Sequence, residues 1–406
     1  MLPGEGQGPM SDETLETVGT RLARARKRRG LTQTGLAQLS VYSRGHIAQV
    51  ETGKKVATPA FVSAAAAALG VDPSELYGQP YRVYGHDYAV HSVIPGLRRT
   101  LAYVDVGPEL AGPPRALDVL AAEIATAGRQ IHKAQLTKLA GRLPAVIEEL
   151  TYWAHETGDP QAWLLLSRGF GHAVSLTRRL GYTGDALALL ERGSEAARRS
   201  GDPNLPHLVM MARALLMMSM DQYRPALTLL DRAAAGVRAD RPDAGEVSGA
   251  IELRSAIVAA RAARGGDGGR AWEYFGRAAE RVRRGGLGAP VHGLEFTAAN
   301  VAIHGAAVAV ELGDMDEAAR RDQRIGEETL AGLPPERRAH HEIDMSRVMT
   351  EVGDLARAER RIAFADRIAP QMITFHPTAR SVVSHLVDAR RTLPEPLRRI
   401  HARMTT

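Results

Sequence analysis

Residues 31–53 read LTQTGLAQLSVYSRGHIAQVETG, a pattern that predicts two short helices crossing through a tight turn. Thr32 and Ser43 each stand before an apolar run, where a hydroxyl oxygen can accept a hydrogen bond from a free backbone N–H of the first helical turn. Gly53 stands where a residue of left-handed backbone geometry would end the second helix. We expect one helix to begin after Thr32 and a second to run from Ser43 to about Glu51.

Three further helices are expected around this pair. Apolar residues at helical spacing, among them Leu22 and Val62, supply a small core for them. Their termini are marked by glycine, by proline and by short polar residues. The three segments are residues 15–28, 58–70 and 72–76. The predicted unit is a five-helix domain over residues 12–77.

The second helix of the quoted pair has two different faces. Ile47 and Val50 are expected to point into the angle between the helices. The residues expected to point outward are Arg44, Gly45, Ala48 and Gln49. Residues 20–60 also hold nine Lys and Arg against one acid, a net charge of +8, so the rest of the +6 chain sums to −2. A basic run alone is usually a solvated helix, but in this setting it is typical of a nucleic-acid-binding module, because neutralising phosphates releases counterions.

These residues resemble the Cro/lambda-repressor type of helix-turn-helix domain, also called the Xre family, over about residues 18–77. The resemblance rests on Leu31-Thr32-Gln33, Leu36-Ala37, Ser43, Ile47, Glu51, Gly53 and the closing residues 71–76, VDPSEL. Two positions depart from the family pattern. Val41 stands where the family usually has the turn glycine, and a β-branched residue suits positive φ poorly. Gly35 replaces a polar helix former, which costs about 1 kcal/mol relative to Ala.

The resemblance implies that two parts of the domain meet the DNA: the start of the helix after Thr32, and the helix after Ser43, which is the third helix of the domain. Arg44 is the expected base reader, because its fork matches guanine O6 and N7 in the major groove. Gln49 would pair with adenine N6 and N7, and His46 would contact a base, a thymine methyl group or a phosphate. The remaining implied contacts, to phosphate, to an outer base or by close backbone approach, are Gln33, Ser43, Gly45, Arg26, Lys54 and Lys55.

The second half of the chain repeats. Five segments each consist of a turn followed by a short helix, with an alanine at the same position of that helix. A longer apolar helix precedes each segment. The marked alanines are Ala186, Ala226, Ala271, Ala318 and Ala358, which are 40, 45, 47 and 40 residues apart. Helix pairs at this interval predict an α-solenoid over residues 116–393. Over about residues 140–370 the spacing loosely resembles tetratricopeptide repeats. The expected fold class is therefore all-α, with a five-helix lambda-repressor-like domain followed by a solenoid of tetratricopeptide-like helix pairs.

The remaining segments are expected to be irregular. Residues 1–11 are rich in Gly and Pro and predict a disordered tail. Residues 78–115 predict a linker that contains one helix near residues 93–104. Residues 394–406 are expected to form a C-terminal tail.

A Cro-type domain joined to tetratricopeptide-like repeats resembles the quorum-sensing peptide receptors of Gram-positive bacteria. That resemblance implies a signalling peptide or small-molecule effector in the groove of the repeats. Projecting the repeat frame places several polar residues of the first helices toward this groove: Arg168, Arg178, Asn300, His340 and Arg347. Arg and Asn there could hold a peptide backbone or a carboxylate. The alternative for each is packing between helices or a solvated face.

Several classes of protein do not fit the sequence. Zero Cys excludes disulfides, thiolate metal sites and cysteine nucleophiles. Residues 340–344, HHEID, lack the His-Glu-x-x-His spacing of a zinc site and are expected to be a structural surface cluster. No phosphate-binding glycine loop, signal peptide or membrane span is recognisable. We expect a cytoplasmic protein that is not an enzyme, with no cofactor and no metal, and a composition typical of an actinobacterium.

The sequence as a whole predicts a sequence-specific transcriptional regulator. A single module of this kind buries little surface on DNA, so we expect a homodimer on a palindromic site of double-stranded DNA. The repeats would pair the subunits and sense the effector. The alternative is an interaction scaffold, whose repeats bind a protein partner and whose helix-turn-helix is only an anchor.

Overall fold

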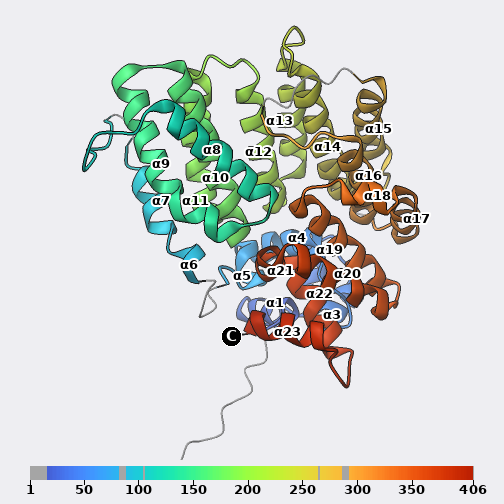
Figure 1. Cartoon of the computed structure of the whole chain (residues 1–406). Helices are drawn as coiled ribbons and strands as arrows, with labels where there is room; N and C mark the ends of the chain where they lie inside the picture. The colour runs from blue at the N-terminus through green and yellow to red at the C-terminus, as the bar shows by residue number, and fades with distance from the viewer. Residues whose placement is uncertain (1–15, 82–87, 104–105, 264–265, 286–291, 406) are drawn as a thin grey trace, which may run out of the picture.

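The computed structural model describes residues 16–81, 88–103, 106–263, 266–285 and 292–405, and these residues form helices and no strand (Figure 1). The expectation of an all-α fold is confirmed. The predicted tail over residues 1–11 lies outside the described residues. No described helix is both long enough and apolar enough to cross a membrane.

The N-terminal domain contains five short helices: α1 (Val18–Arg28), α2 (Gln33–Leu39), α3 (Arg44–Glu51), α4 (Pro59–Leu69) and α5 (Pro73–Tyr77). Thr32 and Ser43 begin α2 and α3 as expected, since each side-chain oxygen accepts a hydrogen bond from the backbone N–H three residues on. Asp72 begins α5 with a reciprocal capping box to Glu75. Gly30 and Gly53 follow helix ends at φ of 65° and 72°, which a residue without Cβ adopts readily.

The helices of this domain enclose one apolar core. It contains Leu22 from α1, Leu36 from α2, Ile47 and Val50 from α3, and Phe61 from α4. Gly19 allows α1 and α3 to approach closely, because a Cβ built on it would lie 2.2 Å from the carbonyl oxygen of Val50. The pair α2–α3 is therefore fixed by packing against α1 and α4.

The segment predicted as a linker is part of the next core. It forms two short helices, α6 (Tyr88–His91) and α7 (Ile94–Thr100), in place of the single expected one. Val90, Ile94 and Leu97 are buried among residues of α8 to α11. These apolar residues lie among Gly, Pro and Tyr, so the helical pattern covers only a few residues and is easily missed.

The repeats follow as antiparallel helix pairs. Their helices are α8 (Leu117–His132), α9 (Leu136–Thr157), α10 (Pro160–Leu180), α11 (Thr183–Arg199), α12 (Leu205–Ser219), α13 (Tyr223–Gly236), α14 (Ala244–Ala263), α15 (Gly269–Arg284), α16 (Ala298–Leu312), α17 (Met315–Ile325), α18 (Glu327–Ala331), α19 (Pro335–Glu351), α20 (Leu355–Ile368), α21 (Pro370–Phe375), α22 (Pro377–Asp388) and α23 (Glu395–Thr405). The five marked alanines lie in α11, α13, α15, α17 and α20, and each is at most 1% exposed. Each of these helices packs against the helix that precedes it in its pair. A small side chain at this register lets the two helices approach.

The predicted C-terminal tail is wrong, because residues 395–405 form α23. Leu397, Ile400 and Met404 are buried in the core shared with α19, α20 and α22. Their spacing of three and four residues is that of one helical stripe. The short length of this segment concealed the pattern.

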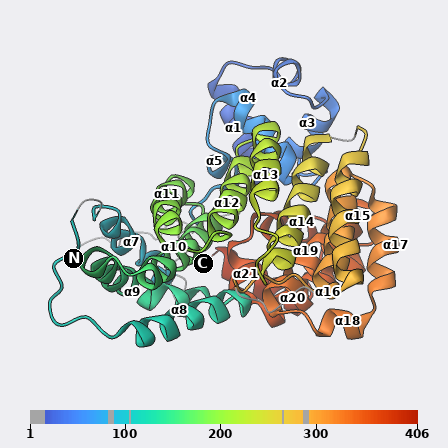
Figure 2. The ribbon, with the colours of Figure 1, turned by 90° about the horizontal axis from the view of Figure 1, so that it is seen from above.

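The N-terminal domain lies against the repeats. In Figure 1 it sits beside α19 to α23, below the arc that α8 to α17 form, and Figure 2 shows it projecting from the repeats with α2 at its outer edge. The Ser63 hydroxyl of α4 donates to the Ser219 carbonyl, with 3.0 Å between the oxygens. The Gln79 side-chain amide donates to the Arg179 carbonyl, at 3.3 Å. Val56 is buried in the C-terminal core. The two parts of the chain thus share an interface.

Candidate nucleic-acid interface

The third helix has the two faces that the sequence predicts. Ile47 and Val50 are buried in the core, whereas Arg44, Gly45 and Gln49 are exposed. Ala48, also expected to point outward, is half-buried. Arg44, Gly45 and Gln49 thus form the exposed edge of α3. These three residues are open to solvent, so a duplex could approach them.

Arg44 has the most available side chain on this edge. It is exposed, and among the described residues its guanidinium makes no hydrogen bond or ion pair. Gly45 lies beside it in open space, since a Cβ built there would meet only the Ser43 hydroxyl, at 3.9 Å. Ser43 is itself exposed, and its oxygen accepts the His46 N–H at 3.2 Å, which leaves the hydroxyl hydrogen free to donate to a phosphate.

Arg26 does not lie where a phosphate contact requires it. Its guanidinium is buried and donates to both carboxylate oxygens of Glu51, at 2.6 and 2.9 Å. A third bond, of 2.7 Å, goes to the Leu31 carbonyl. Arg26 therefore joins α1 to the end of α3, and we correct its expected role from binding phosphate to positioning the third helix.

Gln33 completes this network. Its side-chain amide donates to Glu51 Oε2 at 2.8 Å, which fixes the first residue of α2 relative to α3. Burial opposes ionisation of Glu51, but the hydrogen bonds from Arg26 and Gln33 outweigh it and lower the pKa of this carboxyl below its ordinary value. Gln33 is half-buried at the edge of the domain, and its contact with DNA stays a prediction.

His46 is turned toward the core rather than toward the exposed edge. Its ring stacks on Phe61, with centroids 5.1 Å apart and planes at 14°, and lies 4.9 Å from the Tyr42 ring. Burial, helped by the nearby charge of Lys55, lowers the pKa of His46 to about 4. The neutral, packed ring is a structural group, so we remove His46 from the expected DNA contacts.

The two lysines after α3 differ in their surroundings. Lys54 is exposed, as a phosphate contact requires, whereas Lys55 is half-buried beside the interface with the repeats. The structure also exposes two apolar side chains: Leu39, the last residue of α2, and Val41, in the turn before α3, are 57% and 60% exposed. Val41 does not adopt positive φ, so the missing turn glycine causes no backbone strain there.

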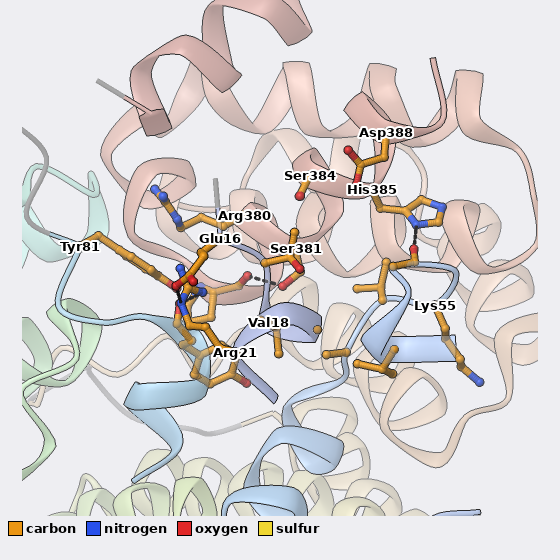
Figure 3. Close-up of a pocket in the computed structure, with 18 residues that line it drawn as sticks. Glu16, Val18, Arg21, Lys55, Tyr81, Arg380, Ser381, Ser384, His385 and Asp388 are labelled. Atoms are coloured by element: carbon orange, nitrogen blue, oxygen red, sulfur yellow. Dashed lines mark hydrogen bonds and ion pairs between the residues drawn. The ribbon is translucent and has the colours of Figure 1, made fainter. Parts of the chain in front are cut away.

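The end of α3 is tied to the C-terminal helices. Figure 3 shows the pocket between the N-terminal domain and α22, with His385 reaching the loop after α3. The His385 Nδ1 lies 3.0 Å from the Gly53 carbonyl oxygen. The Arg380 guanidinium lies over the Tyr81 ring, 4.1 Å from its centroid. The orientation of the domain is therefore coupled to the last repeats.

The residues expected to bind a ligand do not lie together. Arg178 and His340 line a cavity between the N-terminal domain and the repeats. The other three do not line it. Arg347 is buried and bonds to Glu351 and to the Val310 carbonyl, at 3.1 and 3.2 Å, while Asn300 is buried near the start of α16 and donates to the Glu295 carbonyl. Arg168 is half-buried on α10. Asn300 and Arg347 thus serve helix packing, which was the alternative interpretation.

Two clusters of acidic residues and histidine differ from expectation. Residues 340–344 are not a surface cluster, since His341 is buried with its Nε2 2.8 Å from Asp322. Asp202, Asp243 and His292 offer ligand atoms that all lie within 4.8 Å of one another. Such a set could hold a metal ion, although Asp243 already accepts hydrogen bonds from His292 and from Asn204. These residues come from three separate segments, so only folding brings them together.

Comparison with known proteins identifies the N-terminal part. Residues 17–76 match a protein family described as "Helix-turn-helix domain". This part of the chain is a helix-turn-helix domain. Its boundaries agree with those of α1 to α5. The second helix of its helix-turn-helix motif is α3, whose exposed edge carries Arg44. Such domains place that helix in the major groove, so the match supports a DNA-binding regulator.

Comparisons of the whole chain give distant structural likenesses. No curated protein matches its sequence. Among solved structures, a crystal structure of BtubC (BKLC) from P. vanneervenii is 20% identical, with a TM-score of 0.38, and covers 64% of this chain and 94% of its own. A crystal structure of Bacillus thuringiensis PlcR in complex with the peptide PapR7 and DNA is 11% identical, with a TM-score of 0.33, and covers 78% of this chain and 97% of its own. Both TM-scores lie below 0.5, so neither likeness supports a statement about function.

Proposed function

We propose that this protein is a sequence-specific transcriptional regulator that binds double-stranded DNA through its helix-turn-helix domain. The observation that carries the proposal is the exposed guanidinium of Arg44, which has no partner among the described residues, on a helix whose opposite face is buried. A bidentate arginine of this kind discriminates guanine from other bases by about 1–3 kcal/mol. Gln49, exposed one turn further on, would contribute a second base contact.

The regulator acts as a homodimer on a palindromic operator in the cytoplasm. One module of this size binds DNA weakly, and two modules on half-sites roughly 34–36 Å apart add their contacts. The helical repeats pair the subunits and sense a peptide or small-molecule effector, and the protein is not an enzyme. This division of labour is supported by the interface between the domain and the repeats, through which a change in the repeats would reach α3.

The proposal is tested by selecting genomic fragments with the full-length protein and measuring affinity for the selected site. We expect a palindrome with a dimeric footprint. Arg44→Ala should lower affinity by roughly 5- to 150-fold and relax specificity at one position per half-site. Lys54→Ala should weaken binding to all sequences and reduce the salt slope by about one.

Arg129→Ala is the matched control, because Arg129 is an exposed arginine on α8, far from α3 in the chain, and it should leave affinity unchanged. If Arg44→Ala behaves like this control, the base-reading assignment is wrong. If the full-length protein selects no duplex sequence even at low ionic strength, the chain is better described as an interaction scaffold.

A further inference from the structure

The cavity between the helix-turn-helix domain and the repeats has two walls of different origin. One wall comes from α4 and α5 and includes Pro59, Ser63 and Tyr77. The facing wall comes from first helices of the repeats and from the segment around α21. The cavity has a volume of about 150 Å³, comparable with an engineered protein cavity that binds benzene. A molecule in this space would touch both parts of the protein at once.

The wall formed by the repeats has a surplus of positive charge. Two of its three arginines are neutralised, since Arg179 pairs with Glu336 and Arg261 pairs with Glu311. The third, Arg178, makes no side-chain hydrogen bond or ion pair with any described residue. Its cationic neighbour Arg254 is likewise without an ion-pair partner among the described residues, and its Nε is buried without an acceptor.

The charges around Arg178 reinforce one another. The charged groups that act on it are Arg179, Arg254 and Arg337 against a single acid, Glu336. Burial, together with these arginines, lowers the pKa of Arg178 to about 9. Arg178 is half-buried, and a cation held partly out of water with no ion-pair partner among the described residues is costly for a protein. An anion entering the cavity would supply a partner where charges interact more strongly than in bulk water.

The lining also contains a group of apolar side chains. Met220 from the end of α12, Leu136 from α9, and Met372 and Phe375 from α21 also face the cavity. Met and Phe side chains adapt to an aliphatic or aromatic body through dispersion contacts. The lining therefore combines a guanidinium that has no ion-pair partner among the described residues with apolar side chains and with polar groups such as those of Ser63, Gln79 and His340, which fits an amphipathic acid better than an inorganic ion.

We propose that this cavity binds a small organic anion, a carboxylate or phosphate ester with an apolar body, whose charged group pairs with Arg178. The ligand bridges the repeats and the α4–α5 wall of the helix-turn-helix domain, so it sets the orientation of α3. The coupling part of this inference rests on the proposed function, whereas binding itself does not. By linkage, a ligand that alters affinity for the operator must itself bind with altered affinity when the operator is present.

The test is a thermal-shift and calorimetric titration of the full-length protein at constant ionic strength. The probes are hexanoate and hexyl phosphate, with hexanol and hexylammonium as matched neutral and cationic compounds. We expect saturable binding and a rise in Tm for one or both anions and none for the other two compounds. The comparison of the two anions decides between a carboxylate and a phosphate. Equal responses to all four compounds, or no response, would refute the proposal.

Arg178→Met should abolish the response to the anions while leaving the Tm of the ligand-free protein equal or higher, because it removes an uncompensated charge. A merely structural arginine would lower that Tm instead. Arg178→Lys keeps the charge and should retain weakened binding, which keeps the test valid if the Met variant folds poorly. Arg129→Met is the control and should respond like the wild type. If Arg178→Met also responds like the wild type, the site is elsewhere.

Binding to the operator, measured with and without the effective anion, separates the two proposals. Anion binding without any DNA affinity would refute the regulator and leave the cavity assignment standing. Operator binding without any anion binding would refute the cavity assignment alone. If both occur and the anion leaves operator affinity unchanged, the bridging role is wrong.

Discussion

Replacing Arg26 with Met should lower the stability of the helix-turn-helix domain. The two side chains of the Arg26–Glu51 pair are only 10% and 6% exposed, so the pair belongs to the buried class, in which removing one partner costs about 3–5 kcal/mol. Met keeps the apolar stem but loses both bonds to Glu51 and the bond to the Leu31 carbonyl. Because Gln33 still donates to Glu51, we expect the lower end, about 3 kcal/mol, which corresponds to roughly 150-fold in an equilibrium constant.

The assay is hydrogen exchange of the full-length protein, followed in peptides that cover α1 to α3. Under conditions where exchange reports the opening equilibrium, protection in these helices should fall by about two powers of ten in Arg26→Met. Arg28→Met is the matched control, because Arg28 lies on the same helix, is exposed, and is 3.8 Å from Glu75; its effect should stay below about 1 kcal/mol.

Combining Arg26→Met with Glu51→Met should recover part of the loss, since no uncompensated charge then remains. Equal protection in Arg26→Met and Arg28→Met would show that the network does not hold the third helix, and our account of Arg26 would fail.

Three further predictions concern the same domain. Gly19→Ala should lower the free energy of unfolding by about 1–3 kcal/mol, because its Cβ would lie 2.2 Å from the Val50 carbonyl oxygen; denaturant titration of the full-length chain measures this, and an unchanged midpoint would contradict it. Gly35→Ala should stabilise by about 0.5–1 kcal/mol, since its Cβ would make only ordinary contacts at 3.5 Å; a loss of stability would disprove our account of that departure. The pKa of His46, lowered to about 4 by burial and by Lys55, lies below its unfolded value, so the unfolded chain binds more protons and stability should fall as pH drops from about 6.5 toward 4. Thermal melts of His46→Phe should show a weaker pH dependence over that interval than the wild type, and identical slopes would rule out this role.

Much of the local structure was predictable because its causes lie close together in the chain. The hydroxyl of Ser43 and the N–H that it caps are three residues apart, and the glycines that follow the helices act on their own backbone. The alanines of the repeats were recognisable for a similar reason, since each marks the same step of a helix pair. The division of α3 into a buried and an exposed face followed from helical periodicity alone.

The side chains whose roles were mistaken depend on partners that are distant in the sequence. Arg26 resembled a phosphate contact because it belongs to a basic run, but Glu51, 25 residues away, neutralises it. His46 is only two residues from Arg44 in the chain, yet its ring stacks on Phe61 and packs toward the core. Charge and position in a motif do not show which cations are already paired.

The sequence by itself determined the helices, their ends and the repeat that stacks them, because hydrogen bonds and apolar spacing within a few residues decide these features. Only the tertiary structure decided how the helix-turn-helix domain sits on the repeats, through contacts such as that between Gly53 and His385, 332 residues apart. It alone decided that Arg178 faces a cavity and has no ion-pair partner among the described residues. Such features arise where surfaces from separate segments meet, and no local pattern records which surfaces will do so.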